Sequence, residues 1–402
     1  MPPVCDRRWS RVIDYASRAS ARDHADVVGF VRRLDWFLVS AVAALVGYGL
    51  WAVAGITRYD VAGDESYYVV RQAIAAGIGF VGFLLALAID PDRYRRAQSW
   101  LYGLTILLML LVFPLADTTR GSKRWIELGP FQFQPSEFGK LLFVLALAGF
   151  LADRARRLGD PRVVLQAIGL ALVPIFLVFK QPDLGTALVY VLAAAACLFV
   201  AGVRWSHLAA LASLAAFVIA SVVWFLPAAG VEVLKPYQVD RLTAFANRER
   251  DLEGANYNLN QSITAVGSGG LDGRGVDAAT QTRLDYLPEH ATDFVFASLA
   301  EQRGFFGAAV LLGLYLLVVW RGLRVITVAR DSFSAIAAGG IVLAFLFQVF
   351  VNVGMTMGIA PVTGIPLPFV TVGGSSMVAN LVAIGVLQAI YARGNVGRRR
   401  AR

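Results

Sequence analysis

The chain has few charged residues and almost no cysteine. Asp, Glu, Lys and Arg make up 16% of its 402 residues, and only two residues are cysteines. Cys5 lies in a polar amino-terminal stretch and Cys197 inside an apolar run, so the sequence indicates neither a disulfide pair nor redox chemistry. No spacing typical of a metal site stands out, so the residues alone predict no metal.

The sequence also lacks the pattern of a removable signal peptide, because polar and basic residues occupy 1–33 ahead of the first apolar run. We expect residues 1–33 to form a cytoplasmic tail. Its stretch "RRWSRVIDYASRAS" fits an amphipathic helix on the inner membrane surface or a partly ordered tail. The net charge of +9 does not indicate a nucleic-acid partner, since the basic residues fall in short blocks between apolar runs.

Apolar residues are abundant, at 57% of the chain, and they recur in runs close to the twenty or so residues that cross a bilayer as a helix. Within lipid, each helix must satisfy its own backbone polar groups. The sequence therefore predicts an all-α polytopic membrane protein with ten transmembrane helices over 34–392. The expected spans are 34–56, 68–90, 98–116, 135–152, 163–180, 184–203, 207–227, 293–320, 334–358 and 374–392.

The distribution of Lys and Arg predicts that both termini are cytoplasmic. The inner side then receives the arginine-containing connections, Arg321 among them, and the basic tail 393–402, whereas the opposite orientation would internalise far fewer basic residues. The compositionally unusual segments fall on the outer side. They are "TTRGSKRWIELGPFQFQPSE", "KQPDLG", the large external loop 228–292 between spans seven and eight, and "PVTGIPLPFVTVGGSS".

The external segments are expected to be structured. The loop 228–292 is long for a connection without structure of its own, and its pieces "YQVDRLTAFAN" and "YNLNQSITAV" have the pattern of short amphipathic helices. The prolines and glycines of "PVTGIPLPFVTVGGSS" cannot face lipid, so this segment should pack inside the protein or line a cavity. The glycine-rich run 267–275 lacks the Lys-Ser/Thr ending of a phosphate-binding loop and is expected to be a flexible loop.

A carboxylate stands at the start of the eighth span, in "LPEHATDFVFASLAEQRG". Asp293 or Thr292 could cap this helix by accepting a hydrogen bond from an amide of the first turn. A carboxylate near the bilayer core is otherwise costly, about 3 kcal/mol or more at a central position, and such residues tend to be functional. On the residues alone, both interpretations stay open.

Other polar groups also occur within or beside the spans. Glu137 and Lys140 lie three residues apart, which suits a structural ion pair, although a cation at this depth could also serve an anionic ligand. Asp183 follows a proline at a tight turn and makes an ordinary helix start. Gln348 and Asn352, one turn apart, are expected to hydrogen-bond between helices.

The position of these groups along their spans is more informative than any one of them. They gather at the external ends, whereas a carrier or proton relay would distribute ionisable groups across the midplane. This pattern indicates chemistry at one membrane face. The groups are Lys123, Arg124, Glu137, Lys140, Asp183, Asp293 and the final Gly/Pro-rich loop.

Six motifs of the chain resemble, in the same order, those of the SEDS family of bacterial cell-wall polymerases, which includes RodA, FtsW and SpoVE. The resemblance covers nearly the whole chain after residue 34, and "VTGIPLP" is more similar to RodA than to FtsW. The motifs are "GSKRWIELGPFQFQPSEFGKL", "QPDLGTAL", "YQVDRL", "QSITAVGSGGLDGRG", "LPEHATDFVFA" and "PVTGIPLPFVTVGGSS".

This resemblance implies a peptidoglycan glycosyltransferase that polymerises lipid II, the undecaprenyl-diphosphate-linked disaccharide-pentapeptide. The reaction would occur at the outer face of the bacterial cytoplasmic membrane and would serve cell elongation and shape. A class B penicillin-binding protein is the implied crosslinking partner. The alternatives are an FtsW-like division polymerase, a lipid II flippase, and an inactive scaffold for the partner.

The resemblance also implies roles for particular residues. In the family the Asp of the "TDF" motif is needed for polymerisation; it aligns with Asp293, for which we hypothesise the role of general base. Cations would stabilise the leaving diphosphate, and a divalent cation could share that task. The chain departs from the family pattern where His290 precedes Ala291 and where Val372 replaces a common Tyr. The residues expected to bind substrate are Lys123, Arg124, Trp125, Glu137, Lys140, Asp183, Arg241, Gly373, Gly374 and Ser375.

Overall fold

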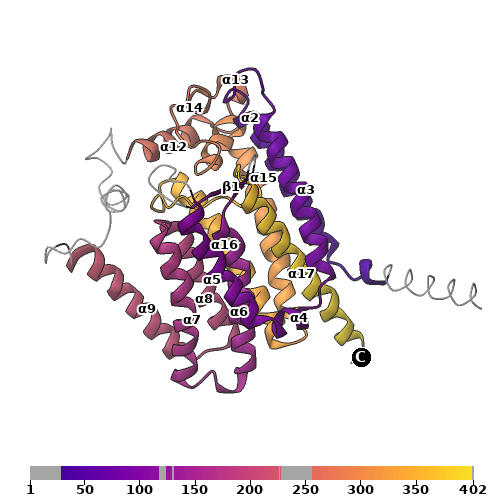
Figure 1. Ribbon diagram of the computed structural model, residues 1–402. Coiled ribbons are helices and arrows are strands. Elements are labelled where there is room, and N and C mark those ends of the chain that lie inside the picture. Colours follow the sequence, from indigo (N-terminus) through magenta and orange to yellow (C-terminus); the bar gives the residue numbers. More distant parts are fainter. Residues whose placement is uncertain (1–28, 117–123, 129–130, 226, 228–255, 401–402) are drawn as a thin grey trace, which may run out of the picture.

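The computed structural model describes residues 29–116, 124–128, 131–225, 227 and 256–400 (Figure 1). Within these residues, nine helices are long and apolar enough to cross a membrane, which confirms a helical multi-pass membrane protein. They are α2 (Trp36–Ile56), α3 (Tyr67–Ala88), α5 (Gln98–Leu115), α6 (Pro135–Asp153), α7 (Pro161–Lys180), α8 (Leu184–Ala201), α15 (Val295–Val328), α16 (Ser332–Thr356) and α17 (Gly374–Arg400).

The remaining expected span, 207–227, corresponds to α9 (Trp205–Ala220), which continues into a short π-helix, η2 (Ser221–Phe225). Its apolar stretch, Trp205–Val218, is shorter than the roughly 20 residues that cross a bilayer. In Figure 1, α9 lies at the edge of the bundle and slants away from it. The described part of the chain therefore holds nine helices of spanning length and one shorter apolar helix at the predicted place.

Aspartate residues fix where several helices begin. The carboxylate of Asp35 accepts a hydrogen bond from the Leu38 amide at the start of α2, at 3.1 Å. Asp160 does the same for the Arg162 amide of α7, whose first residue is a proline, and Asp331 for the Ser334 amide of α16. Such caps satisfy amides that have no partner inside the helix, so short polar residues between apolar runs define the helix boundaries.

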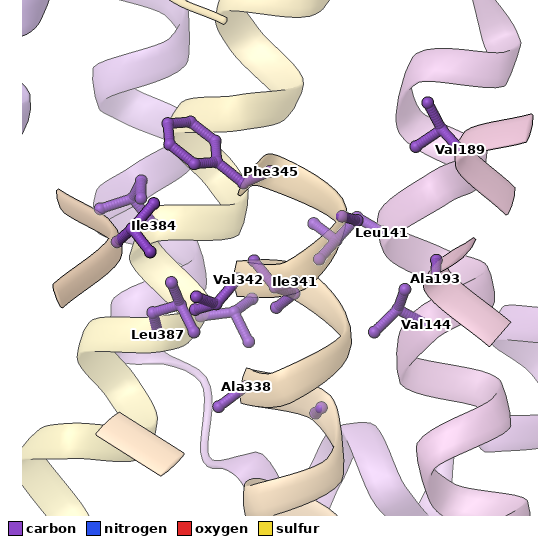
Figure 2. Close-up of a cluster of buried hydrophobic side chains, with 14 of the residues drawn as sticks. Leu141, Val144, Val189, Ala193, Ala338, Ile341, Val342, Phe345, Ile384 and Leu387 are labelled. Carbon is purple, nitrogen blue, oxygen red and sulfur yellow. The ribbon is translucent and has the colours of Figure 1, made fainter. Parts of the chain in front are cut away.

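Helices α6, α16 and α17 form the centre of the bundle, with 72%, 72% and 83% of their apolar segments buried, against 28% in α3 and 17% in α5. The outer helices present apolar side chains outward, as expected for a protein solvated by lipid. Gly340 of α16 allows close packing, because a Cβ there would stand 2.7 Å from Cys197 Sγ. Figure 2 shows part of this core, where side chains of four helices meet. They include Leu141, Val144, Val189, Ala193, Ile341, Val342, Ile384 and Leu387.

The expected end of the eighth span at residue 320 is wrong. The sequence places Arg321 in a connection, but α15 continues to Val328 and Arg321 lies inside the helix, 4% exposed. Its Nε lies 3.1 and 3.0 Å from the two carboxylate oxygens of Asp35, and its Nη2 lies 2.6 Å from one of them. A guanidinium can be buried when a carboxylate pairs with it in such a geometry. This pair allows the helix to continue past Arg321. Likewise α17 continues as a helix to Arg400, into the expected tail 393–402.

The two ends of the bundle differ (Figure 1). One end carries the short helix α4 (Pro91–Arg96) and the carboxyl terminus. The other carries β1 (Ile126–Leu128), which pairs antiparallel with β2 (Phe131–Phe133), and the short helices that precede α15. The latter are α12 (Tyr257–Ser268), α13 (Gly275–Ala278) and α14 (Thr280–Arg283). The piece "YNLNQSITAV" is therefore helical as expected, whereas "YQVDRLTAFAN" lies outside the described residues. The short 3-10 helix η1 (Ala155–Arg157) connects α6 to α7.

The short helices dock on α15 through a buried carboxylate. Glu301 of α15 is fully buried and accepts hydrogen bonds from the backbone amides of Gln281 and Thr282, at 2.8 and 3.0 Å. The hydroxyl of Thr282 donates a third bond, at 2.7 Å. A carboxylate that accepts from amides at a helix start is well satisfied despite its burial, so Glu301 joins α14 firmly to α15.

A break in α15 at Gly304 joins the same two parts of the chain. Gly304 has φ 63° and ψ −163°, which no helical residue adopts. The amides of Phe305 and Phe306 donate instead to the carbonyls of Gly270 and Leu271, at 2.9 and 3.2 Å. The run 267–275 was expected to be a flexible loop, but its backbone carbonyls replace hydrogen bonds that α15 loses at the break.

Candidate active site

Asp293 lies on a tight turn between α14 and α15. The amides of Thr292 and Phe294 both donate to the carbonyl of Glu289, at 3.1 Å, and Glu289 has a positive φ of 57°. Helix α15 begins at Val295 with Phe294 at its N-cap position, and the Phe294 side chain makes no capping hydrogen bond. Asp293 therefore lies one residue before the N-cap position, at the end of the turn.

Helix α16 and the final loop hold the backbone of this turn. The side-chain amide of the fully buried Asn352 donates to the Asp293 carbonyl at 3.0 Å. The Thr371 hydroxyl donates to the Thr292 carbonyl at 3.0 Å, and the Val372 amide donates to the Ala291 carbonyl at 3.0 Å. Three successive carbonyls are fixed, which holds the Asp293 backbone in one place. The contact at position 372 uses backbone atoms and does not require a Tyr side chain.

The final loop, 357–373, is itself packed inside the protein, as its composition predicts. Leu367 and Val370 are fully buried. The side chain of Gln72, from α3, donates to the Thr371 carbonyl at 2.9 Å and accepts from the Gly373 amide at 3.1 Å. Gln72 was not singled out from the sequence, although a lone amide within an apolar span is a signal for an interhelical contact.

Glu137 and Lys140 form the expected ion pair, with Lys140 Nζ 2.8 and 2.9 Å from the two oxygens of Glu137. Gln348 of α16 accepts a third bond from the same ammonium, at 2.9 Å. These three side chains and Asn380 line one part of a cavity of about 50 Å³, and the rest of its lining is apolar residues of α6, α15, α16 and α17. Gln348 lies four residues before Asn352, which is about 6 Å along the axis of α16. The same helix therefore contacts both this ion pair and the Asp293 turn.

A second charged group lies at the start of α8. Asp183 caps this helix by accepting from the Thr186 amide at 3.0 Å, as the sequence predicts. One Asp183 oxygen also lies 3.8 Å from Arg124 Nη1, and Gln134 donates to the other at 3.4 Å. The Gln134 amide in turn donates to the hydroxyl of the buried Ser375, at 2.9 Å. The hairpin, α8 and the start of α17 therefore meet around Asp183.

The final loop also packs against the start of α8, next to Asp183. A Cβ on Gly185 would lie 2.5 Å from the Thr363 carbonyl, so α8 approaches the loop as closely as two backbones allow. Gly374 is the first residue of α17, and Trp125 is half-buried beside Arg124. Lys123 and Arg241 lie outside the described residues. Thus contacts through α16, the start of α17 and the final loop connect the described candidates.

Among the residues that the structure describes, no group of three or more His, Cys, Asp or Glu could hold a metal ion. Arg124 and Lys140 are the two described candidates that carry positive charge at this site. Each is paired with a carboxylate that is less than 5% exposed. Each of the two cations therefore has an anionic partner at the site.

Comparison with known proteins gives the family. The family description "Cell cycle protein", which covers FtsW, RodA and SpoVE, matches residues 32–395. The chain belongs to the FtsW/RodA/SpoVE family. The SEDS resemblance of its motifs is thereby confirmed.

Three curated relatives of this family illustrate its range. The chain is 35% identical to peptidoglycan glycosyltransferase MrdB of Escherichia coli strain K12, over 86% of this chain and 92% of MrdB. It is 35% identical to stage V sporulation protein E of Bacillus subtilis strain 168, over 87% and 93% of the two chains. It is 34% identical to a probable peptidoglycan glycosyltransferase FtsW of Trichlorobacter lovleyi, over 89% and 93%. These relatives confirm the expected enzyme class, a peptidoglycan glycosyltransferase, but they do not distinguish a RodA from an FtsW.

Solved structures of the FtsW/RodA/SpoVE family share the fold. One, described as structural coordination of polymerization and crosslinking by a peptidoglycan synthase complex, matches with a TM-score of 0.76 at 31% identity, over 90% of this chain and 98% of that chain. The rod shape determining protein RodA of Thermus thermophilus matches with a TM-score of 0.63 at 29% identity, over 89% and 96% of the two chains. The membrane domain is thus that of the family throughout.

Proposed function

We propose that the chain polymerises lipid II at the outer face of the bacterial cytoplasmic membrane, with Asp293 as the general base. The observation that carries this proposal is the fixed turn. Hydrogen bonds from Asn352, Thr371 and Val372 hold three successive carbonyls of the Asp293 turn. Such restraint suits a group that must meet a reacting hydroxyl in one geometry.

In the proposed reaction, the acceptor sugar 4-hydroxyl attacks the anomeric carbon of the donor while Asp293 takes its proton. The new glycosidic bond forms as the bond to the diphosphate breaks, and the direct displacement inverts the donor centre. Glycoside hydrolysis needs a second carboxyl group to protonate the leaving oxygen. A diphosphate leaves as a stabilised anion, so the site needs cations there instead of an acid.

Arg124 and Lys140 are the described side chains proposed to bind the diphosphate, since guanidinium and ammonium groups pair well with phosphate oxygens. Arg124 lies beside the buried Asp183, and Lys140 donates to the buried Gln348. Lys123 and Arg241 stay in the proposal on sequence grounds alone. A divalent cation could add to this charge, and no described cluster is assigned to it.

The size of the cavity limits where the lipid tail can lie. About 50 Å³ is far below the roughly 300–1,000 Å³ of pockets that enclose small ligands. A polyprenyl chain therefore does not fit inside this cavity. We propose that the tail remains in the bilayer beside the outer helices while the sugar and diphosphate reach the site.

The test is an assay of glycan formation from lipid II by purified chain in detergent. We expect Asp293→Asn to lower polymerisation by about 10²–10⁴-fold, the contribution of a placed base, with folding and precursor binding retained. The matched control is Asp272→Asn, the same chemical change at an exposed position of the same external region. Unchanged polymer formation by Asp293→Asn would remove the base assignment. Polymer formation by the purified chain would also exclude a pure flippase, which makes no polymer.

We further propose that the chain works in elongation with a class B penicillin-binding protein that crosslinks the new strands. The support for a partner is a structural neighbour described as a peptidoglycan synthase complex that coordinates polymerization and crosslinking. The support for elongation is the "VTGIPLP" motif, which is more similar to RodA. Capture of the chain from bacterial membranes and identification of the bound transpeptidase tests both, since a division-specific transpeptidase would contradict the elongation role.

A further inference from the structure

His290, three residues before Asp293, connects the Asp293 turn to the loop between α2 and α3. Its Nε2 lies 3.0 and 3.2 Å from the two carboxylate oxygens of Asp60. Its Nδ1 lies 3.3 Å from the Leu287 carbonyl and 3.5 Å from an Asp285 oxygen. The ring is 12% exposed and the Asp60 side chain 19%, so both are largely shielded from water.

Both ring nitrogens therefore face acceptor oxygens, which are carboxylate oxygens of Asp60 and Asp285 and the Leu287 carbonyl oxygen. A neutral imidazole has one N–H, so one of its nitrogens would direct a lone pair at an oxygen. Only the doubly protonated ring donates on both sides. The geometry thus selects the imidazolium form, whichever way the ring is drawn.

The loop that carries Asp60 is itself attached to the short helices α13 and α14. The neighbouring Tyr59 donates from its hydroxyl to Asp277 of α13 at 2.5 Å. The guanidinium of Arg283, from α14, lies 5.1 Å from the centre of the Tyr59 ring and donates to the Asp277 carbonyl at 2.7 Å. The α2–α3 loop is thereby attached to the short helices, and His290 attaches the Asp293 turn to that loop.

We propose that protonated His290 is a positioning residue for the polymerase, which holds the Asp293 turn against Asp60 and releases it when the ring loses its proton at alkaline pH. This inference rests on the proposed role of Asp293. Asn352, Thr371 and Val372 restrain the turn on its α16 and final-loop side. His290 restrains it from the side of α2 and α3, so loss of this contact leaves the turn held on one side.

The charged groups facing His290 favour its protonation. Burial alone would lower the pKa of His290, but the hydrogen bond and charge of Asp60, with Asp285 and the Leu287 carbonyl, raise it above its ordinary value. Asp285 is 79% exposed and contributes less through water. The neighbouring Glu289 carboxylate accepts from the Thr292 hydroxyl at 2.8 Å.

The sign of the pH effect follows from the raised pKa. The contact is complete below the ordinary histidine pKa of about 6.5 and is lost as the pH rises through the raised value. On the acidic side, activity requires ionised Asp293 and falls for a different reason. We therefore expect a bell-shaped pH profile of kcat, with His290 responsible for the alkaline limb.

The experiment compares pH profiles of kcat and KM for polymerisation of lipid II by the full chain. We expect His290→Gln to lower kcat by about tenfold at neutral pH, less than the 10²-fold that a 1 Å misplacement can cost, with KM unchanged. The profile of the unsubstituted chain should converge on that of His290→Gln at alkaline pH. His290→Arg, which stays charged, should keep kcat and flatten the alkaline limb. Asp60→Asn should resemble His290→Gln, whereas Asp285→Asn should have little effect.

The matched control is His207→Gln on α9, which should leave the whole profile unchanged. An alkaline limb that persists in His290→Arg, or a normal kcat in His290→Gln, would overturn the inference. If His290→Gln unfolds, His290→Arg still tests the inference. Replacement of a purely structural histidine would not change the shape of the pH profile. Asp293→Asn is assayed alongside. If it is inactive while His290 variants behave normally, only this inference fails; if it is fully active, the proposed function fails and this inference with it.

Discussion

The break in α15 leads to a prediction that compares two glycines of this helix. Gly304 lies at the break and is closely surrounded, whereas Gly313 has open space beside it. Gly304 has φ 63° and ψ −163°, a conformation that side chains with a Cβ avoid. A Cβ there would lie 2.3 Å from the Gly273 amide nitrogen and 2.4 Å from the Leu271 carbonyl oxygen. At Gly313 a Cβ would meet nothing within 4 Å.

The free-energy cost of Gly304→Ala follows from these contacts. The backbone strain costs about 1–3 kcal/mol. The clashing atoms belong to the backbone of 271–273, which must move away, and this movement weakens the bonds from Phe305 and Phe306 to that loop. Each such bond contributes about 0.5–1.5 kcal/mol, so we expect a total destabilisation of roughly 2–6 kcal/mol. Gly313→Ala should instead stabilise the helix by up to about 1 kcal/mol.

The assay is thermal unfolding of both purified variants in the same detergent, with polymer formation measured on the folded fraction. Gly304→Ala should unfold at a clearly lower temperature than the unsubstituted chain, and Gly313→Ala at an equal or higher one. The Gly304 variant should also lose activity, since α15 carries the Asp293 turn. Equal unfolding temperatures for the two variants would refute the reasoning, because nothing but the local backbone distinguishes the two changes.

Two further substitutions separate folding from activity. Gln72→Leu removes the partner of the Thr371 carbonyl and the Gly373 amide, and each unsatisfied buried group costs about 1–3 kcal/mol, so both the unfolding temperature and the polymerisation rate should fall; a normal rate would show that the final loop does not need this support. Asp35→Asn leaves the buried Arg321 without its carboxylate and should cost about 3–5 kcal/mol in thermal unfolding, yet the rate of the folded fraction should be unchanged because the pair lies beside Gln388, towards the carboxyl end of α17. A reduced rate in folded Asp35→Asn would contradict this separation.

The helices could be predicted from the sequence because lipid imposes a strong and local constraint. Runs of apolar residues near the length of a bilayer give the spans, and Asp-Pro pairs such as Asp160–Pro161 give their starts. The ends were less predictable. Arg321 looks like a loop residue in sequence, and only the distant Asp35, 286 positions earlier, makes its burial inside α15 possible.

The sequence indicates which residues are candidates for the site, but not which of them contact one another. Proline and glycine content shows that the final loop must be packed, because its backbone cannot face lipid. It does not show that Thr371 and Val372 contact the Asp293 turn, or that Gly273 packs beside Gly304, since each contact joins segments far apart in the chain. The Asp60 contact of His290 is similar: nothing near "RYD" in the sequence indicates a partner in the external region.

The candidate site holds two kinds of groups, the proposed base and the cations, and they have different structural requirements. The proposed general base must be in the right place, and Asp293 is held by hydrogen bonds to its backbone and that of Thr292, which do not depend on its own charge. The cations proposed to bind the diphosphate, Arg124 and Lys140, each face a buried carboxylate instead. A diphosphate that approaches them can share these cations without moving the base. The turn and the ion pairs are supported by separate contacts, so substitution of either cation should leave the Asp293 turn in place.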